Sequence, residues 1–482
     1  MKNSRIVIAA PKSGSGKTLL TCGLLKVFTD RKLKVKSYKC GPDYIDPMFH
    51  KYILGVEGGN LDSWFSGEKE IRNRIVRETR DKDITVIEGV MGYYDGLGGN
   101  STTASAYDIA RITETPAVLI VDGKGMSLSV GALVKGFKEF RKDSRIAAVI
   151  ANRTSPMMET RLRECVEETG CAFLGCLPEN KDWKWESRHL GLMRPEEMGN
   201  VRETIEKLAE GMEKYLDIHR LLEIGKTAGP LENEWFQDRT ENVRKTGMLS
   251  GFSAADLKKE RVKIAIARDE AFCFYYKENM DILESMGAEL AAFSPLYDEK
   301  LPDGTDGILL GGGYPELYAE KLSENTLLKQ EIRKMAEKGM PIIGECGGFL
   351  YLLKELEGKN GTFYPMTGVL TGKGFRRENL NRFGYVEMTA GPFSGFLKEG
   401  ETIKGHEFHY WDSTENGEIF HARKPSGGKS WDCIQRKNNV EGGFPHLYYL
   451  SSPSYAERFV EKCREFHRKS QTVCQKNGGK GQ

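Results

Sequence analysis

The stretch that decides the N-terminal fold is IVIAAPKSGSGKT, residues 6–18, which runs from a short apolar segment through a glycine-rich loop. The last part of this loop has the spacing of a Walker A motif, with Gly14, Gly16, Lys17 and Thr18 at the expected positions. Glycines let backbone N–H groups approach phosphate, Lys17 would reach the β/γ phosphates, and the Thr18 hydroxyl would ligate Mg²⁺. Pro11 stands where the common pattern has its first glycine. The stretch predicts an ATP site between a strand and a helix.

Short apolar runs on either side of helix-like segments extend this pattern. The runs are β-branched and do not alternate with polar residues, as in parallel strands buried on both faces; they span residues 5–10, 84–88, 117–122 and 146–152. Helix-like segments separate them at residues 18–28, 68–78 and 129–140. This βαβ series predicts a doubly wound parallel sheet.

A second series of the same kind begins at residue 262. Its strand-like runs span residues 262–267, 288–293, 307–310 and 340–344, and the glycine- and aromatic-rich sequence after residue 361 adds further strands. Residues 201–222 form a polar helical stretch, and residues 226–256 lack periodicity, as in a linker. We therefore predict an α/β protein with two doubly wound domains. The predicted boundaries are 1–225 for the P-loop domain, 226–260 for the linker, 261–470 for the second domain and 471–482 for a polar tail.

The composition excludes several classes of protein. The 482 residues carry a net charge of +2, which gives no electrostatic argument for a nucleic-acid or anionic-membrane partner. No run approaches the roughly 18 apolar residues that a transmembrane helix needs, so we expect a cytoplasmic protein. None of the ten cysteines forms a C-x-x-C pair, and most are expected to be small core residues.

Three acidic segments follow predicted strands in the first domain. Glu88 ends the run at 84–88, at the edge where doubly wound sheets bind ligands and a carboxylate can hold Mg²⁺. Asp43 and Asp46 lie in GPDYIDP, and Asp95 follows in the flexible turn GVMGYYDG. Either loop alone is more typical of a turn than of catalysis. Together the three segments favour a metal and substrate site.

A cysteine in a sharp strand-to-helix turn marks the second domain. GGGYPEL at 311–317 has glycines whose amides can face a developing oxyanion, and GECGG at 344–348 forms an elbow at Cys346. The helix that follows is expected to favour the Cys346 thiolate. Three histidines are candidates for its base: His406 and His409 in GHEFHY, and His446 in GGFPHLYY. H-E-x-H is one residue short of the zincin motif, which disfavours a metal.

Taken together, the first-domain motifs resemble the cobyrinate a,c-diamide synthases, whose ATP domain is related to dethiobiotin synthetase. The motifs are APKSGSGKT, GPDYIDP, EGVMGYYDG and ESRHLGL at 186–192. The resemblance implies that Asp43, Asp46 and Glu88 position Mg-ATP, that Asp95 lies near the activated carboxylate, and that Asn152 contacts adenine. It assigns no chemical role to the motif residues Ser187, Arg188 and His189.

The second domain resembles a class I glutamine amidotransferase of the cobyric-acid-synthase type. The resemblance implies that Cys346 is the nucleophile and His446 the general base. Ordinary class I members have Glu two residues after this histidine, whereas this chain has Tyr448. Glu316 and Glu407 are candidates for orienting His446, and surface roles are the alternative for both.

We therefore predict a ligase that uses ATP, Mg²⁺ and glutamine to amidate the a and c acetate side chains of cobyrinate. The same chemistry on nickel-sirohydrochlorin or hydrogenobyrinate is an alternative, because a macrocycle is recognised by a pocket and not by a motif. A partitioning-type P-loop switch is a third possibility, supported by Lys12 alone, which matches the extra lysine of the deviant Walker A loop. The sequence does not predict the oligomeric state.

Overall fold

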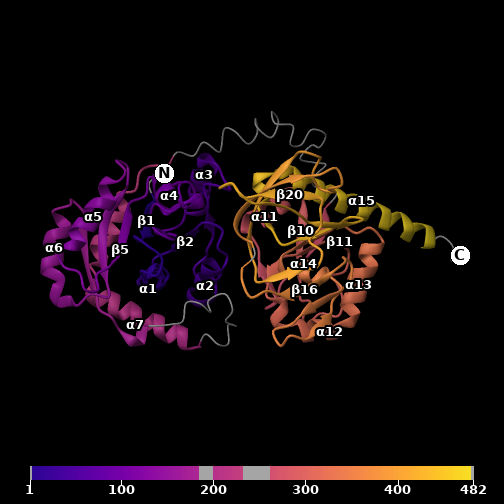
Figure 1. Ribbon diagram of the computed structural model, residues 1–482, viewed down its shortest axis with the longest axis horizontal. Helices are drawn as coiled ribbons and strands as arrows, with labels where there is room; N and C mark the ends of the chain where they lie inside the picture. Colours follow the sequence, from indigo (N-terminus) through magenta and orange to yellow (C-terminus); the bar gives the residue numbers. More distant parts are fainter. Residues whose placement is uncertain (1–2, 184–198, 232–260, 381, 479–482) are drawn as a thin grey trace. The chain divides into compact units, whose positions relative to one another are not determined.

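The computed structural model describes residues 3–183, 199–231, 261–380 and 382–478 (Figure 1). Contacts divide the chain into two compact units, Met1–Glu241 and Asn242–Gln482. The division falls inside the predicted linker, most of which lies outside the described residues. The finer domain boundaries therefore stay predictions.

The first unit is built on a seven-stranded parallel sheet with the order β3-β2-β4-β1-β5-β6-β7. Its strands are β1 Ser4–Ala9, β2 Val35–Cys40, β3 Asn60–Leu61, β4 Ile84–Glu88, β5 Ala117–Asp122, β6 Ile146–Asn152 and β7 Ala172–Leu177. The sequence pattern predicted β1, β4, β5 and β6 but not the other three. β2 was not predicted because it carries the polar residues Lys36, Ser37 and Lys39, although all six of its residues are buried.

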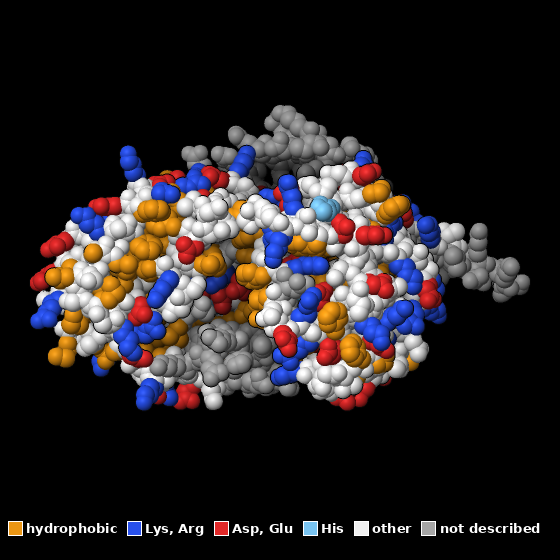
Figure 2. All heavy atoms as spheres, viewed as in Figure 1, with side chains coloured by type: hydrophobic (Ala, Val, Ile, Leu, Met, Phe, Trp, Pro, Cys, Tyr) orange, Lys and Arg blue, Asp and Glu red, His pale blue; other side chains and the backbone are white. Residues whose placement is uncertain are grey.

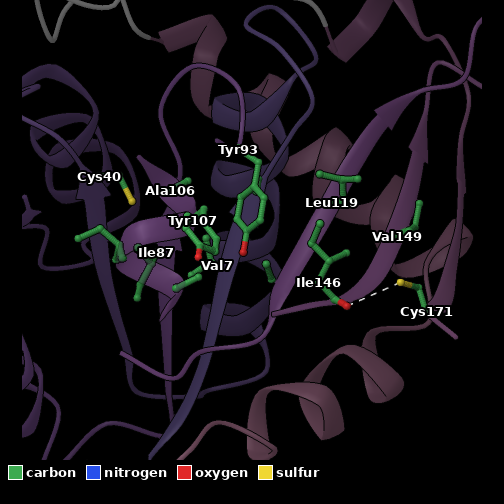
Figure 3. Packing of buried hydrophobic residues seen from close by; sticks show 14 of the residues in the cluster. Val7, Cys40, Ile87, Tyr93, Ala106, Tyr107, Leu119, Ile146, Val149 and Cys171 are labelled. Atoms are coloured by element: carbon green, nitrogen blue, oxygen red, sulfur yellow. Dashed lines mark hydrogen bonds between the residues drawn. The ribbon is translucent and has the colours of Figure 1, made fainter. Parts of the chain in front are cut away.

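Helices cover both faces of this sheet, as a doubly wound fold requires. They are α1 Lys17–Asp30, α2 Ile45–Leu54, α3 Glu68–Glu78, α4 Ala106–Ile112, α5 Ser129–Glu139, α6 Glu159–Glu167, α7 Gly199–Tyr215 and α8 Ile218–Lys226. Ile6 and Ile8 of β1 pack in one core with α1, α7 and α8, while Val7 and Ala9 pack in another with α3 to α6. Figure 3 shows Tyr93 and Tyr107 in the second core beside Val7. Burial of an aliphatic side chain such as Ile6, Val7 or Ile8 contributes about 1.5–3 kcal/mol to the stability of the fold.

The second unit has a six-stranded sheet with the order β10-β8-β11-β13-β23-β22, parallel except for β22. Its strands are β8 Val262–Ala267, β10 Ala288–Phe293, β11 Thr305–Leu310, β13 Ile342–Glu345, β22 Gln435–Lys437 and β23 Val440–Gly443. One face packs against α12 Ala319–Glu324, α13 Thr326–Glu337 and α14 Gly347–Leu352. The other packs against α11 Lys277–Ser285 and α15 Pro453–Gly478. The predicted second doubly wound domain is thereby confirmed.

Smaller sheets account for the predicted strands of the later sequence. A five-stranded antiparallel sheet has the order β21-β20-β17-β18-β24: Ser430–Cys433, Phe420–Arg423, Phe383–Ala390, Thr402–Phe408 and His446–Leu447. A four-stranded sheet contains β15 Phe363–Pro365, β14 Glu355–Glu357, β16 Lys373–Arg376 and β19 Trp411–Ser413. A short pair joins β12 Gly312–Gly313 to β9 Phe272–Phe274.

The structure refines the description of two polar segments. The stretch at 201–222 is two helices, because Asp217 caps α8 through a hydrogen bond from Arg220 N–H to its carboxylate. The predicted polar tail is helical through Gly478, since α15 continues past residue 470.

The burial of the cysteines and the distribution of surface charge agree with what the composition predicts. Of the nine cysteines whose burial the structure describes, eight are buried and Cys273 is partly exposed, in accord with the predicted core role. Figure 2 shows acidic and basic side chains interspersed on the visible face of each unit. Within the described ranges, no helix combines the length and apolar character needed to cross a membrane.

Candidate active sites

The predicted phosphate loop connects β1 to α1. Gly16 precedes the helix with φ 97°, and Gly14 has φ 75°, both in the left-handed region that favours glycine. Lys17 is buried, and its Nζ donates hydrogen bonds to the carbonyls of Lys12 and Met91. Burial, aided by the charge of Lys39, lowers the pKa of Lys17 to about 8. The Lys17 ammonium is thus held by backbone oxygens of the phosphate loop and of the segment that follows β4.

Glu88 is the centre of a buried charge cluster at the end of β4. Its Oε1 accepts hydrogen bonds from Thr18 Oγ1 at 2.6 Å and from Lys39 Nζ at 2.7 Å. Lys39 Nζ also lies 2.5 Å from Asp46 Oδ2, and His50 Nε2 lies 3.5 Å from Glu88 Oε2. Strand pairing of β2 with β4 brings Lys39 opposite Glu88. The Lys39 ammonium therefore joins the predicted ligands Asp46 and Glu88, and Thr18 is bonded to the same Glu88 oxygen.

Burial and neighbouring charges shift the pKa values of the two carboxyl groups of this cluster in opposite directions. Burial and the nearby Glu88 charge raise the pKa of Asp46 to about 8. Burial also opposes ionisation of Glu88, but Lys39 and His50 outweigh it and hold the pKa of Glu88 below its ordinary value. We conclude that Glu88 is the ionised partner of Lys39.

The donor set of this cluster fits Mg²⁺, a hard cation that takes oxygen ligands. Thr18 and Glu88 touch directly, and Asp46 shares Lys39 with Glu88. No group of three or more His, Cys, Asp or Glu side chains in the described ranges could hold a metal alone. The ion would therefore need the Thr18 hydroxyl, and phosphate or water oxygens would complete its coordination.

The other predicted residues of this unit lie around the cluster. Asp43 Oδ1 accepts the N–H of Ile45 at 2.8 Å, which fixes the turn into α2. Asp95 Oδ2 accepts the N–H of Gly92 at 3.0 Å, and its charge reaches Lys17. Asn152 Nδ2 donates to the carbonyl of Ser15 at 2.9 Å. Asn152 thus supports the phosphate loop, and its adenine contact stays a prediction.

Sequence reasoning missed Lys39 and His50. Lys39 stands just before the GPDYIDP turn, at the same sheet edge as Glu88, and His50 lies one helical turn after Asp46. These two positions in the sequence could have indicated that Lys39 and His50 belong to the cluster. Ser187, Arg188 and His189 lie outside the described residues.

The predicted elbow at Cys346 connects β13 to α14. Cys346 has φ 49° and ψ −102°, a strained conformation of the kind found at nucleophile elbows. Its N–H donates to the carbonyl of Gly443, and Gly348 N–H donates to that of Gly311. A Cβ on Gly348 would lie 2.1 Å from the Leu310 carbonyl oxygen. The glycine is therefore required for the helix to pack against β11.

Burial of the Cys346 thiol opposes the thiolate that the helix was expected to favour. Burial, with a further contribution from the Glu316 carboxylate, raises the pKa of the Cys346 thiol. Cys346 thus needs a base to remove its proton.

His446 follows β23, the neighbour of β13 in the sheet, so both residues lie at one sheet edge. A Cβ on Gly312 would lie 2.2 Å from His446 Cε1, which shows how closely the imidazole packs on the glycine loop. Burial and the nearby His409 lower the pKa of His446 to about 3. The ring is consequently neutral and able to accept a proton.

The competing histidines have other environments. His409 stacks on Phe444 with ring centroids 3.9 Å apart, and its Nε2 lies 3.4 Å from Glu407 Oε2. His406 is the strand partner of His446, across β18 and β24. These contacts favour His446 as the base.

Glu345 is the acidic residue that sequence reasoning missed here. Its Oε2 lies 4.0 Å from His446 Nδ1. Glu316 and Glu407, the predicted candidates, are both buried, so surface roles are excluded for them. At position 448, where Glu is usual, the tyrosine ring packs edge-on against Tyr276. The position of Glu345 directly before Cys346 could have indicated from the sequence that it lies in this site.

Both units match known families. Residues 6–192 match the CobQ/CobB/MinD/ParA nucleotide binding domain, and residues 263–454 match the CobB/CobQ-like glutamine amidotransferase domain. A cobyrinate a,c-diamide synthase of Caldanaerobacter subterraneus is 38% identical over 96% of this chain and 99% of its own length. One from Thermoplasma volcanium is 37% identical over 97% of this chain and 99% of its own. The chain belongs to the cobyrinate a,c-diamide synthase family.

Proposed function

We propose that this protein amidates the a and c acetate side chains of cobyrinate, using ATP and glutamine, in cobalamin biosynthesis. The observation that carries the proposal is that one chain combines a phosphate loop beside a buried acidic cluster with a cysteine elbow and a buried neutral histidine, which follow neighbouring parallel strands of the second sheet. The relatives that span almost the whole chain bear the name of this activity.

In the second unit, Cys346 would attack the carboxamide carbon of glutamine. The thiol proton passes to His446, the Sγ–C bond forms, and His446 returns the proton to the departing nitrogen as ammonia is released. Water then hydrolyses the thioester to glutamate. Backbone amides of Gly313 and Gly347 would bind the oxyanion; a Cβ on Gly347 would lie only 3.1 Å from Gly313 N, so the two segments adjoin.

In the first unit, the phosphate loop would hold ATP while the γ-phosphoryl group moves to a substrate carboxylate. That step is needed because a free carboxylate is a poor electrophile at neutral pH, whereas ammonia displaces phosphate from an acyl phosphate. Thr18, Asp46 and Glu88 would hold Mg²⁺, which neutralises phosphate charge when bound. Lys17 would bind the phosphates, and Asp95 would orient the acceptor carboxylate.

Lys39 has a part in this proposal because its ammonium pairs with the ionised Glu88 and also contacts Asp46. A divalent cation bound by the same carboxylates would have to displace that ammonium or share them with it. A cytoplasmic location, and small molecules as the only partners, stay predictions of the sequence.

The test is an assay of purified protein with ATP, glutamine and each of three macrocycles: cobyrinate, hydrogenobyrinate and nickel-sirohydrochlorin. Mass spectrometry should detect a diamide of cobyrinate together with ADP and glutamate. Amidation of another macrocycle alone would replace the substrate and keep the chemistry. ATP hydrolysis without amidation of any macrocycle would favour the partitioning-type switch instead.

A further inference from the structure

A buried histidine base needs a group that fixes its tautomer and stabilises its charge when it takes a proton. His446 is 3% exposed, and burial disfavours its charged form. The side chain at position 448, where related amidotransferases carry the acid, is a tyrosine packed on Tyr276. The orienting group must therefore come from another position in the fold.

Glu345 has the position that this role requires. It is the last residue of β13 and is 7% exposed. Its Oε1 accepts a hydrogen bond from the Tyr449 hydroxyl at 3.1 Å, and the nearby Leu447 backbone N–H favours its ionised form. These two groups come from the segment that carries His446. The Oε2 of the same carboxylate lies 4.0 Å from His446 Nδ1.

The separation of 4.0 Å exceeds a hydrogen bond, but such contacts are often long without substrate and tighten in the reacting complex. The two other acidic candidates face elsewhere. Glu407 Oε2 lies against His409 Nε2, and Glu316 lies on the glycine loop, where its charge acts on the Cys346 thiol. Glu345, by contrast, forms an ion-pair contact with His446 itself.

We propose that Glu345 is the positioning residue of the glutaminase site, accepting a hydrogen bond from His446 Nδ1–H so that Nε2 faces Cys346. The inference rests on the proposed roles of Cys346 and His446. The acid would thus precede the nucleophile in sequence instead of following the base. Burial raises the pKa of Glu345 to about 8. When the thiol proton moves to His446, the imidazolium favours the ionised carboxylate of Glu345, which then offsets the imidazolium charge.

The test compares Glu345→Gln with Glu407→Gln, both isosteric changes of a buried carboxylate. Glu345→Gln should lower the kcat of glutaminase by about 10²-fold or more, as expected for loss of the group that orients a catalytic histidine. The KM for glutamine should change by less than roughly threefold, because the proposed role is in proton transfer and not in binding. Glu407→Gln should retain glutaminase kcat, and amidation driven by ammonium chloride should survive in both variants.

A second variant covers the case in which Glu345→Gln fails to fold. Tyr449→Phe removes one hydrogen bond to the carboxylate and should lower glutaminase kcat by roughly fivefold, the equivalent of one ordinary hydrogen bond, with KM unchanged. Glutaminase kcat within threefold of wild type in Glu345→Gln would overturn the inference. So would a larger loss in Glu407→Gln. If the wild-type protein itself releases no glutamate from glutamine, the proposed function fails first.

Discussion

Gly312→Ala probes the contact between the glycine loop and the proposed base. The added Cβ would lie 2.2 Å from His446 Cε1, whereas ordinary contact begins at 3.4 Å, so the imidazole must withdraw by about 1.2 Å. Gly312 does not have a positive φ, so the change adds no backbone strain and acts through this contact. A misplacement of about 1 Å in a catalytic group costs on the order of 10²-fold in rate, or about 2.7 kcal/mol.

The assay measures glutamate release and ammonia-driven amidation with the same preparations. Gly312→Ala should lower glutaminase kcat by about 10²-fold and leave ammonia-driven amidation at the wild-type rate, because the ATP site is in the other unit. Gly136→Ala is the matched control, since a Cβ there meets nothing within 4 Å. Overpacking costs about 1–3 kcal/mol of stability, so thermal unfolding should be measured for each variant. Glutaminase within threefold of wild type would refute the packing argument for His446.

Three further predictions concern the phosphate loop, the acidic cluster and pH. Gly16→Ala should weaken ADP binding by more than roughly tenfold in calorimetry, because its φ is strained for alanine and the Cβ would lie 2.5 Å from Asn152 Nδ2; Gly67→Ala, where a Cβ has open space, should not. Glu88→Gln should lower ATP-dependent amidation by about 10²-fold while glutaminase persists, and equal loss of both would contradict separate sites. His446 has a folded pKa of about 3 against roughly 6.5 unfolded, so the unfolded state binds more protons between these values and stability falls as pH drops through that window. In urea unfolding, His446→Gln should reduce the stability lost between pH 6.5 and 5 by up to about 2 kcal/mol; an unchanged loss would contradict a buried neutral ring.

The parts of the sites that the sequence predicted are those made by contiguous residues. The loop around Gly16 and the elbow around Cys346 need glycines at fixed spacings, and those spacings are visible without a structure. The fold was predictable for a similar reason, since strands such as β1 and β4 are uniformly apolar.

What the sequence could not predict depends on contacts between distant segments. Lys39 belongs to the Glu88 cluster because β2 pairs with β4, and β2 is disguised by its polar residues. Glu345 faces His446 because β13 pairs with β23, a contact across about a hundred residues of sequence. The protonation of Cys346 depends on burial by the whole fold, which raises the pKa of its thiol and which the local motif does not reveal.

One chain is proposed to release ammonia at Cys346 and to use it at a separate ATP site. The most direct measurement follows the label from amide-¹⁵N glutamine into the macrocycle, in wild type and in Cys346→Ser. Wild type should give a labelled diamide. Cys346→Ser should give none from labelled glutamine, yet should form the labelled diamide from ¹⁵N ammonium chloride and ATP. Labelled product from glutamine in Cys346→Ser, or failure of that folded variant to use ammonium, would contradict the account.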